Sequence, residues 1–202
     1  MSHVSAGYVK TSLALLALLA LSACASPAQQ QAMIPDVTEE TLIDDSSRLA
    51  QAVELGEVSG GEDTNPLWTS EVGTAEFEGA LRDALASHAL LANENGRYEL
   101  VVTLTKLDQP LIGFDMTVTS KVRYVLTDIR EQKVVFDESI DHSFTATVGD
   151  AFVAVQRLRL ANEGSIRENI RHFLVELIKR DRTPEQLSSL DNISIRSIKI
   201  NS

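Results

Sequence analysis

The chain has 202 residues, with 18 basic and 29 acidic side chains, and its formal net charge is −11 at neutral pH. Such an acidic protein is not drawn to nucleic acid, or to anionic lipid A phosphates, by long-range attraction. Its single cysteine excludes an intramolecular disulfide, and its length suits one folded domain with tails.

The N-terminus has the layout of a signal peptide. Residues 1–10 carry one cation, Lys10, and no acid, and residues 11–21 form an uncharged apolar run. A run of about a dozen residues is typical of a signal-peptide core, whereas a membrane-spanning helix needs about 20. Small residues then precede Cys24. We therefore expect a signal peptide over residues 1–23, cleaved before Cys24. The alternatives are a secretory signal followed by a chance cysteine, or an uncleaved anchor helix.

The sequence Leu21-Ser-Ala-Cys24 resembles the lipobox of bacterial lipoproteins. The resemblance implies that Cys24 receives a diacylglycerol thioether and an N-acyl chain. It also implies sorting to the outer membrane, because Ala25 stands where an aspartate commonly retains lipoproteins in the inner membrane. The expected partner is then the membrane itself, through the lipid anchor, with the rest of the chain facing the periplasm.

The next elements are predicted from composition and apolar spacing. Residues 24–48 are rich in Ala, Gln, Ser and acidic residues without a period, which predicts a lipidated flexible tether. Residues 50–58 are expected to form a short strand. Residues 75–91 read as a helix, capped by Thr74, because Phe77, Leu81, Ala84, Leu85 and Leu91 fall near one face.

Three longer strands are predicted over residues 97–107, 115–129 and 133–148, since apolar and polar side chains alternate along each. The alternation is typical of an antiparallel sheet with one face open to water. The open face should carry Thr117, Thr119 and Arg123. Glu138 and His142 interrupt the apolar face, which a bulge or a sheet edge would explain.

A second helix is predicted over residues 150–180, with an apolar stripe made of Phe152, Val155, Ile166, Ile170, Phe173 and Leu177. Residues 193–200 could add a final strand. The predicted fold is α+β: a two-layer sandwich of an antiparallel sheet with two amphipathic helices. We assign it to a single periplasmic domain over residues 49–202.

Polar residues interrupt the apolar stripe of the second helix. This candidate interaction patch consists of Arg157, Arg159, Asn162, Glu163 and Arg167. Arg159 and Glu163 are four residues apart and can pair on one helix face. Gly164, unfavourable inside a helix, would allow another backbone to approach. The patch is either a recognition surface or a polar bridge satisfied within the domain.

No catalytic residues, metal ligands or cofactors are predicted. The histidines His88, His142 and His172 lie on different elements without ligand spacing, and neither a nucleophile elbow nor a phosphate loop is present. Apolar loop residues are a further feature: Leu67, Trp68, Phe114 and residues 110–113. They either form a docking edge that faces a membrane or barrel protein, or pack under their own domain.

The whole layout, from the lipobox through the strand meander to the closing helix, resembles small envelope lipoproteins of the YajG and LptE kind. The resemblance implies a non-enzymatic outer-membrane lipoprotein that serves as an accessory or structural component of envelope assembly or transport. A barrel or transport protein of the outer membrane would be its partner. A lipid- or glycan-binding periplasmic module is the alternative. An envelope acyltransferase-type enzyme ranks last, since no hexapeptide repeat occurs.

Overall fold

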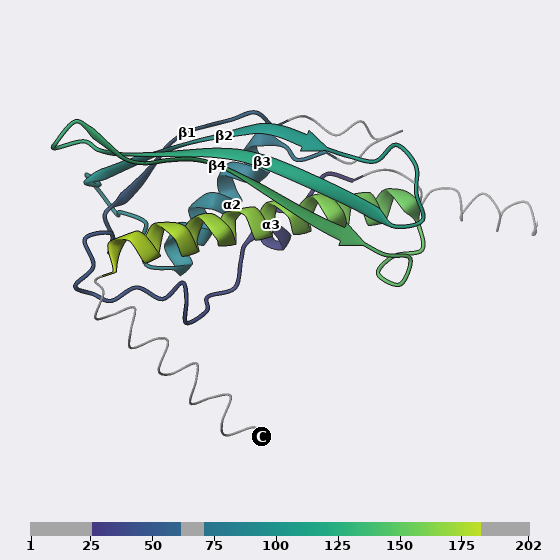
Figure 1. The fold of residues 1–202 in the computed structure, drawn as a ribbon, viewed down its shortest axis with the longest axis horizontal. Helices are drawn as coiled ribbons and strands as arrows, with labels where there is room; N and C mark the ends of the chain where they lie inside the picture. Colours follow the sequence, from purple (N-terminus) through teal and green to yellow (C-terminus); the bar gives the residue numbers. More distant parts are fainter. Residues whose placement is uncertain (1–25, 62–70, 183–202) are drawn as a thin grey trace, which may run out of the picture.

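The computed structural model describes residues 26–61 and 71–182. It confirms the α+β class, because a four-stranded sheet is covered on one face by two helices (Figure 1). The elements in chain order are a 3-10 turn η2 (Gln30–Met33), β1 (Val53–Ser59), α2 (Thr74–Ser87), β2 (Tyr98–Asp108), β3 (Met116–Asp128), β4 (Lys133–Ala146) and α3 (Ala154–Asp181). Cys24, Leu67, Trp68 and the predicted strand over 193–200 lie outside the described residues.

The sheet has the order β1-β2-β3-β4, and β2, β3 and β4 form an antiparallel meander as predicted. The first strand departs from the prediction, since β1 pairs with β2 in parallel. The reason is the connection between them. Helix α2 lies between β1 and β2 in the chain, and parallel neighbours require such a crossover, whereas a short turn joins antiparallel ones.

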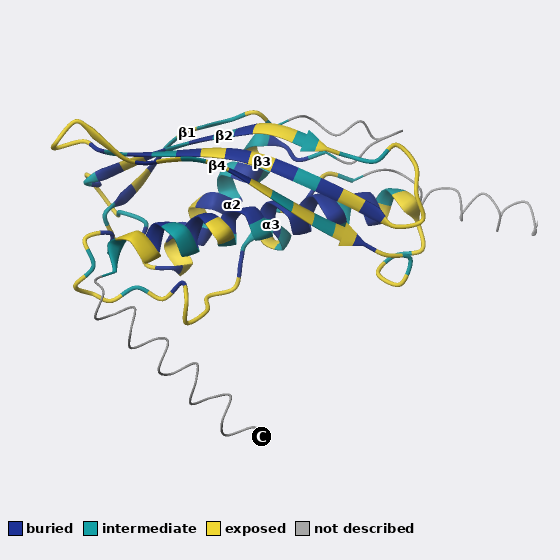
Figure 2. Cartoon of the chain, viewed as in Figure 1, coloured by how far each residue is buried: buried dark blue, intermediate teal, exposed yellow. Residues whose placement is uncertain are grey.

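One face of the sheet is open to water, as the alternation predicts. Along β3 buried and accessible residues alternate; Thr117 and Arg123 are exposed and Thr119 is partly so (Figure 2). Glu138 and His142 are explained by the edge position of β4, where both remain partly accessible and Glu138 pairs with Arg180 of α3.

The other face packs against α2 and α3. Helix α2 buries Phe77, Leu81 and Leu85 against the core. It ends at Ser87, earlier than predicted, because Ala89 has a φ of +55° and the following backbone returns to β1, where the Ala92 amide donates to the Val53 carbonyl at 2.8 Å. In α3, Phe173 stacks on Tyr124 of β3 with ring centroids 4.2 Å apart.

Helix α3 begins at Ala154, four residues later than predicted. A turn over residues 147–150 precedes it, closed by the Asp150 carboxylate, which accepts from the Thr147 amide at 2.7 Å and from its hydroxyl at 2.8 Å. Phe152 therefore lies before the helix and is 91% exposed, so its predicted place on the apolar stripe is wrong.

The predicted flexible tether is also wrong for its described part. Residues 26–52, which we call the N-terminal strap, lie against the helices and bury Ala28, Met33, Thr41 and Leu49. The folded unit therefore includes residue 26 onward and does not begin at residue 49. Its few buried residues are irregularly spaced, so no helical or strand periodicity in the sequence indicated that this segment is folded. Within residues 26–61 and 71–182, no helix is long and apolar enough to span a bilayer.

Candidate functional site

Three charged side chains of α3 hold the start of the N-terminal strap. Arg159, Glu163 and Arg167 are spaced by four residues, which places them one above another on a single helix face. Arg159 Nη1 donates to Ser26 Oγ at 3.0 Å, Glu163 Oε1 accepts from the Gln29 amide at 2.9 Å, and Arg167 Nη1 donates to the Ala32 carbonyl at 2.9 Å. The strap thus starts beside α3 and runs in the same direction as the helix.

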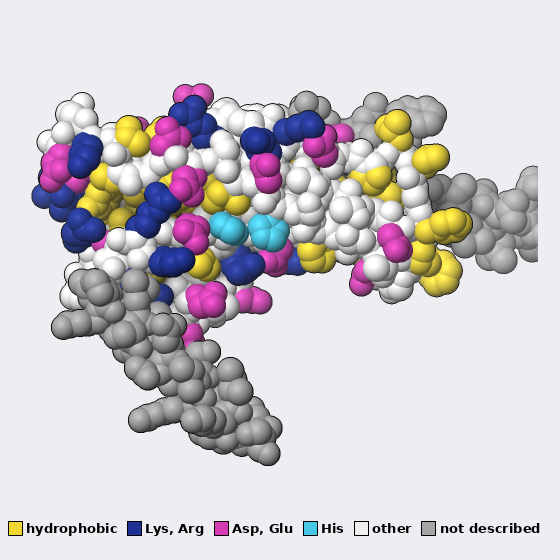
Figure 3. Space-filling view, viewed as in Figure 1, with side chains coloured by type: hydrophobic (Ala, Val, Ile, Leu, Met, Phe, Trp, Pro, Cys, Tyr) yellow, Lys and Arg dark blue, Asp and Glu magenta, His cyan; other side chains and the backbone are white. Residues whose placement is uncertain are grey.

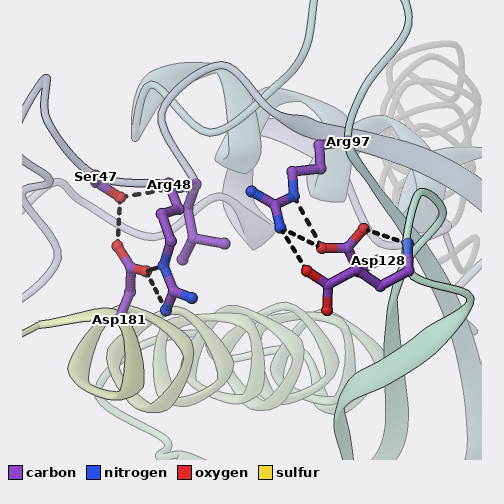
Figure 4. A network of polar contacts seen from close by, with 7 residues as sticks. Ser47, Arg48, Arg97, Asp128 and Asp181 are labelled. Atoms are coloured by element: carbon purple, nitrogen blue, oxygen red, sulfur yellow. Dashed lines mark hydrogen bonds and ion pairs between the residues drawn. The ribbon is translucent and has the colours of Figure 1, made fainter.

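The end of the strap is fastened at the far end of α3. Asp181 accepts hydrogen bonds from Ser47 Oγ at 2.6 Å and from Arg48 Nε at 3.0 Å, shown on the left of Figure 4. Arg182 donates to the Leu42 carbonyl at 2.6 Å. The strap therefore follows α3 from its second turn to its last residue, and the chain preceding Ser26 enters at the N-terminal end of that helix.

Glu163 is the most buried acid of this contact, with 5% of its side chain accessible. Burial raises the pKa of Glu163, against the opposing effects of the Gln29 hydrogen bond and the nearby charges of Arg159 and Arg167. The predicted Arg159–Glu163 pair is confirmed, with 3.5 Å between Arg159 Nε and Glu163 Oε1. The Glu163 carboxylate therefore connects the strap backbone to Arg159 of α3.

The other two residues of the predicted patch hold loops at the same end of the molecule. Arg157 is buried, and its Nη1 donates to the carbonyls of Ala151 and Phe152 at 2.7 and 2.8 Å. Asn162 is fully buried, and its Oδ1 accepts from Gln109 Nε2 at 3.2 Å, just after β2. All five predicted patch residues thus contact other parts of their own chain. These contacts are those of the polar bridge within the domain.

Gly164 makes room for the side chain of Phe144, whereas we expected from the sequence that another backbone would approach it. A Cβ added at this position would lie closer than 3.0 Å to Cγ, Cδ1 and Cε1 of Phe144 on β4. The Phe144 ring also lies under the Arg167 guanidinium, 5.5 Å from Cζ to the ring centroid. The missing side chain therefore lets α3 pack directly on the edge strand.

A buried polar network joins α3 to the middle of the sheet. The Tyr124 hydroxyl donates to Asn169 Oδ1 at 3.0 Å, and Asn169 Nδ2 donates to the Ile140 carbonyl at 2.8 Å. Ser120 Oγ donates to the Ser165 carbonyl at 3.0 Å. Burial raises the pKa of Tyr124 well above its usual value, so the phenol stays protonated. Side chains fill this stretch of the helix–sheet seam, so a ligand there would have to displace them.

Two of the three histidines in the described part of the chain come together, although their sequence positions gave no sign of it. The His142 ring on β4 and the His172 ring on α3 have centroids 5.8 Å apart, and such a pair is visible in the middle of the face drawn in Figure 3. His88 is separate, with Nδ1 2.7 Å from the Ala84 carbonyl. Among the described residues, no group of three or more His, Cys, Asp or Glu side chains could hold a metal ion.

A further ion pair lies at the end of the sheet where β2 begins and β3 ends. Arg97 lies just before β2, and its guanidinium contacts Asp128 at the end of β3, at 2.8 Å through Nε and 2.7 Å through Nη2 (Figure 4, right). Burial alone would raise the pKa of Asp128, but hydrogen bonds from Arg97 and from the amides of Glu131 and Arg130 lower it. Sequence reasoning missed this pair, although an aspartate just before the short link between the strands predicted over 115–129 and 133–148 commonly caps a turn.

No protein-family model and no curated protein matches the sequence. Three solved structures resemble the fold in part. A candidate lipoprotein from Caulobacter crescentus is 17% identical, with 64% of this chain and 90% of that one aligned and a TM-score of 0.47. A protein from Xanthomonas campestris is 13% identical, with 74% and 98% aligned and a TM-score of 0.47.

The third, a minor lipoprotein from Acinetobacter baumannii, is 12% identical, with 65% of this chain and 94% of that one aligned and a TM-score of 0.42. TM-scores below 0.5 at such identities do not bear on function. The functional conclusion therefore depends on this chain's own residues.

Proposed function

We propose that this chain is a non-enzymatic lipoprotein of the bacterial outer membrane, anchored through acyl chains on Cys24 with its domain facing the periplasm. The observation that carries the proposal is the succession of a charged start, a short apolar run and Leu21-Ser-Ala-Cys24. The place of Ser26 supports it. Cys24 is two residues before Ser26, which Arg159 of α3 holds, so at most about 7 Å of chain separates the acylated residue from the described fold.

The short connection distinguishes this protein from lipoproteins on long linkers. A flexible tether over 24–48 would let the domain explore the periplasm, with a root-mean-square reach of about 5–6 Å times the square root of its length. The strap removes this freedom because it is packed along α3. A domain held next to the membrane is suited to support or position a neighbouring envelope component, which is the accessory role that we propose.

The open face of the sheet is the surface we propose for that component. It carries Thr117 and Thr145, whose hydroxyls are 2.8 Å apart, and the exposed pair of Arg123 and Asp137 at 2.9 Å. No helix covers this face in the described part of the chain (Figure 1). A polar, wet surface of this kind fits a reversible protein contact better than an obligate one. The partner class is a barrel or transport protein of the outer membrane.

The anchor is tested by mass spectrometry and membrane fractionation. The N-terminal peptide of the purified protein should start at Cys24 and carry the mass of a diacylglyceryl and an acyl group. Cys24→Ser should abolish the modification and the cleavage before residue 24, whereas Ala25→Asp should keep the modification and move the protein to the inner-membrane fraction. An unmodified Cys24 in a membrane-bound protein would refute the assignment.

The accessory role is tested by photo-crosslinking in cells. A crosslinking amino acid placed at Thr117, on the open face, should capture a defined outer-membrane protein. The matched control places it at Glu78 of α2, whose side chain is 44% accessible, on the opposite layer. Equal capture from both positions, or none from Thr117, would contradict the proposed docking face. Loss of specific capture with Arg123→Glu would support it.

A further inference from the structure

Two loops at the N-terminal end of α3 expose large apolar side chains. The loop between β2 and β3 exposes Leu111 by 96%, Ile112 by 89% and Phe114 by 87%, and the loop between β4 and α3 exposes Phe152 by 91% and part of Val153. We call these five residues the apolar tip. Figure 3 shows hydrophobic side chains gathered at one end of the molecule, the end where these loops lie in Figure 1.

The apolar tip is built on braced loops. The Val148 amide donates to Asp115 Oδ1 at 3.3 Å, which joins the two loops to each other. The buried Arg157 donates hydrogen bonds to the carbonyls of Ala151 and Phe152, as described above. Exposed apolar side chains on fixed backbone mark a site of contact with a partner or a membrane, since isolated domains seldom leave such a cluster in water.

The described chain begins at the same end of the molecule, with Ser26 beside α3. Arg159, which holds Ser26, is six residues after Val153, a distance of about 9 Å along a helix. Cys24 precedes Ser26 by two residues, which span at most about 7 Å. On the proposed function, acyl chains on Cys24 therefore enter the bilayer close to the N-terminal end of α3, the end that carries the apolar tip. A membrane that holds those chains is the nearest apolar phase to the five side chains.

We propose that the apolar tip inserts into the lipid surface next to the acylated cysteine and gives the domain a second membrane contact. The inference rests on the proposed lipid anchor. Phe, Leu and Ile suit the boundary between headgroups and acyl chains. The acidic residues of the same loops, Asp115 and Asp150, give anionic headgroups no attraction. Insertion is therefore driven by apolar area, and the long strands project away from the membrane.

The test uses the acylated full-length product in phosphatidylcholine vesicles. Acylation occupies the thiol of Cys24, the only native cysteine, so an introduced cysteine is the sole target of a thiol-reactive, environment-sensitive fluorophore. Ile112→Cys places the fluorophore in the apolar tip. The matched control is Arg130→Cys, in the turn after β3, about 40 Å away because β3 has 13 residues.

Brominated acyl chains should quench the fluorophore at position 112 several-fold more strongly than at position 130, and aqueous iodide should do the reverse. Replacing a third of the lipid by phosphatidylglycerol should leave this contrast unchanged or weaken it. Equal quenching at both positions, or quenching at 112 that requires anionic lipid, would overturn the proposal. A tip that stays aqueous would point to a protein partner.

A second measurement separates this inference from the anchor. In a non-acylated chain with residues 1–23 removed and Cys24→Ser, vesicle binding depends on the apolar tip. Leu111→Ser, Ile112→Ser and Phe114→Ser together should weaken its flotation with phosphatidylcholine vesicles by at least about tenfold, without changing its urea midpoint, because the three side chains are already exposed. Unchanged flotation would refute insertion. The acyl mass at Cys24, read on the unsubstituted protein, reports independently on the anchor.

Discussion

Because Gly164 packs closely on Phe144, we expect Gly164→Ala to lower the free energy of unfolding when the Phe144 ring is present and to raise it when the ring is absent. Gly164→Ala would normally stabilise a helix interior by about 1 kcal/mol. Here the new methyl group would lie closer than 3.0 Å to three atoms of the Phe144 ring. Overpacking of this kind costs typically about 1–3 kcal/mol. We therefore expect the free energy of unfolding of Gly164→Ala to fall by about 1 kcal/mol, with a range from near zero to about 2.

The same substitution should stabilise a chain without the ring. In Phe144→Ala, the obstructing atoms are absent, so Gly164→Ala should raise the free energy of unfolding by up to about 1 kcal/mol. The two effects give a coupling energy of about 1–3 kcal/mol between the positions, well above the scatter of independent sites. Urea unfolding of the four chains of this cycle, with residues 1–23 removed and Cys24→Ser, measures it. Equal effects of Gly164→Ala in both backgrounds would refute the packing argument.

Three further predictions concern the strap, the ion pair and the buried network. Glu163→Ala should expose the strap to limited proteolysis before global unfolding, because the Gln29 amide loses its acceptor, whereas Glu163→Gln should not; equal cleavage would contradict the contact. The pKa of Asp128 is lowered from 3.8, so its ionisation stabilises the fold above that pH and the benefit disappears as pH falls through the lower folded value. Asp128→Asn should therefore be less stable than the parent at pH 6 in urea, and the difference should narrow below about pH 4; a constant difference would exclude this linkage. Asn169→Ala leaves the Tyr124 hydroxyl and a backbone carbonyl without partners and should cost roughly 2–4 kcal/mol of unfolding free energy, and a cost under about 0.5 would contradict the network.

The regular elements could be predicted because each has a period that burial imposes. The alternation along β3 gave both its limits and its open face, and the spacing of Phe77, Leu81 and Leu85 gave α2. The parallel pairing of β1 with β2 was missed. Periodicity shows which face of a strand is buried, but it does not show whether the neighbouring strand runs parallel or antiparallel. The β-α-β order was the available signal.

The strap and the position of Phe152 were harder to predict, since both depend on polar contacts that apolar spacing does not show. The Gln29 amide meets a carboxylate 134 residues later, and nothing in the composition of residues 24–48 indicates it. Phe152 fits a helical wheel, yet Asp150 closes a turn that delays the helix and turns the ring out to solvent. The five polar residues of α3 were found because they break an apolar stripe, but their partners lie on other segments.

The strap also sets the order in which the chain can become native. Its first residues precede those of the sheet in the chain, while its partner α3 ends at Asp181, so the Ser47 hydroxyl has its acceptor 134 positions later. Contacts of such long range are costly in loop-closure entropy and form slowly. A chain truncated before Arg159 would have a complete meander, but its N-terminal strap would lack the contacts that Arg159, Glu163 and Arg167 supply. Completion of the last helix is thus the event that fixes the first folded residues in place.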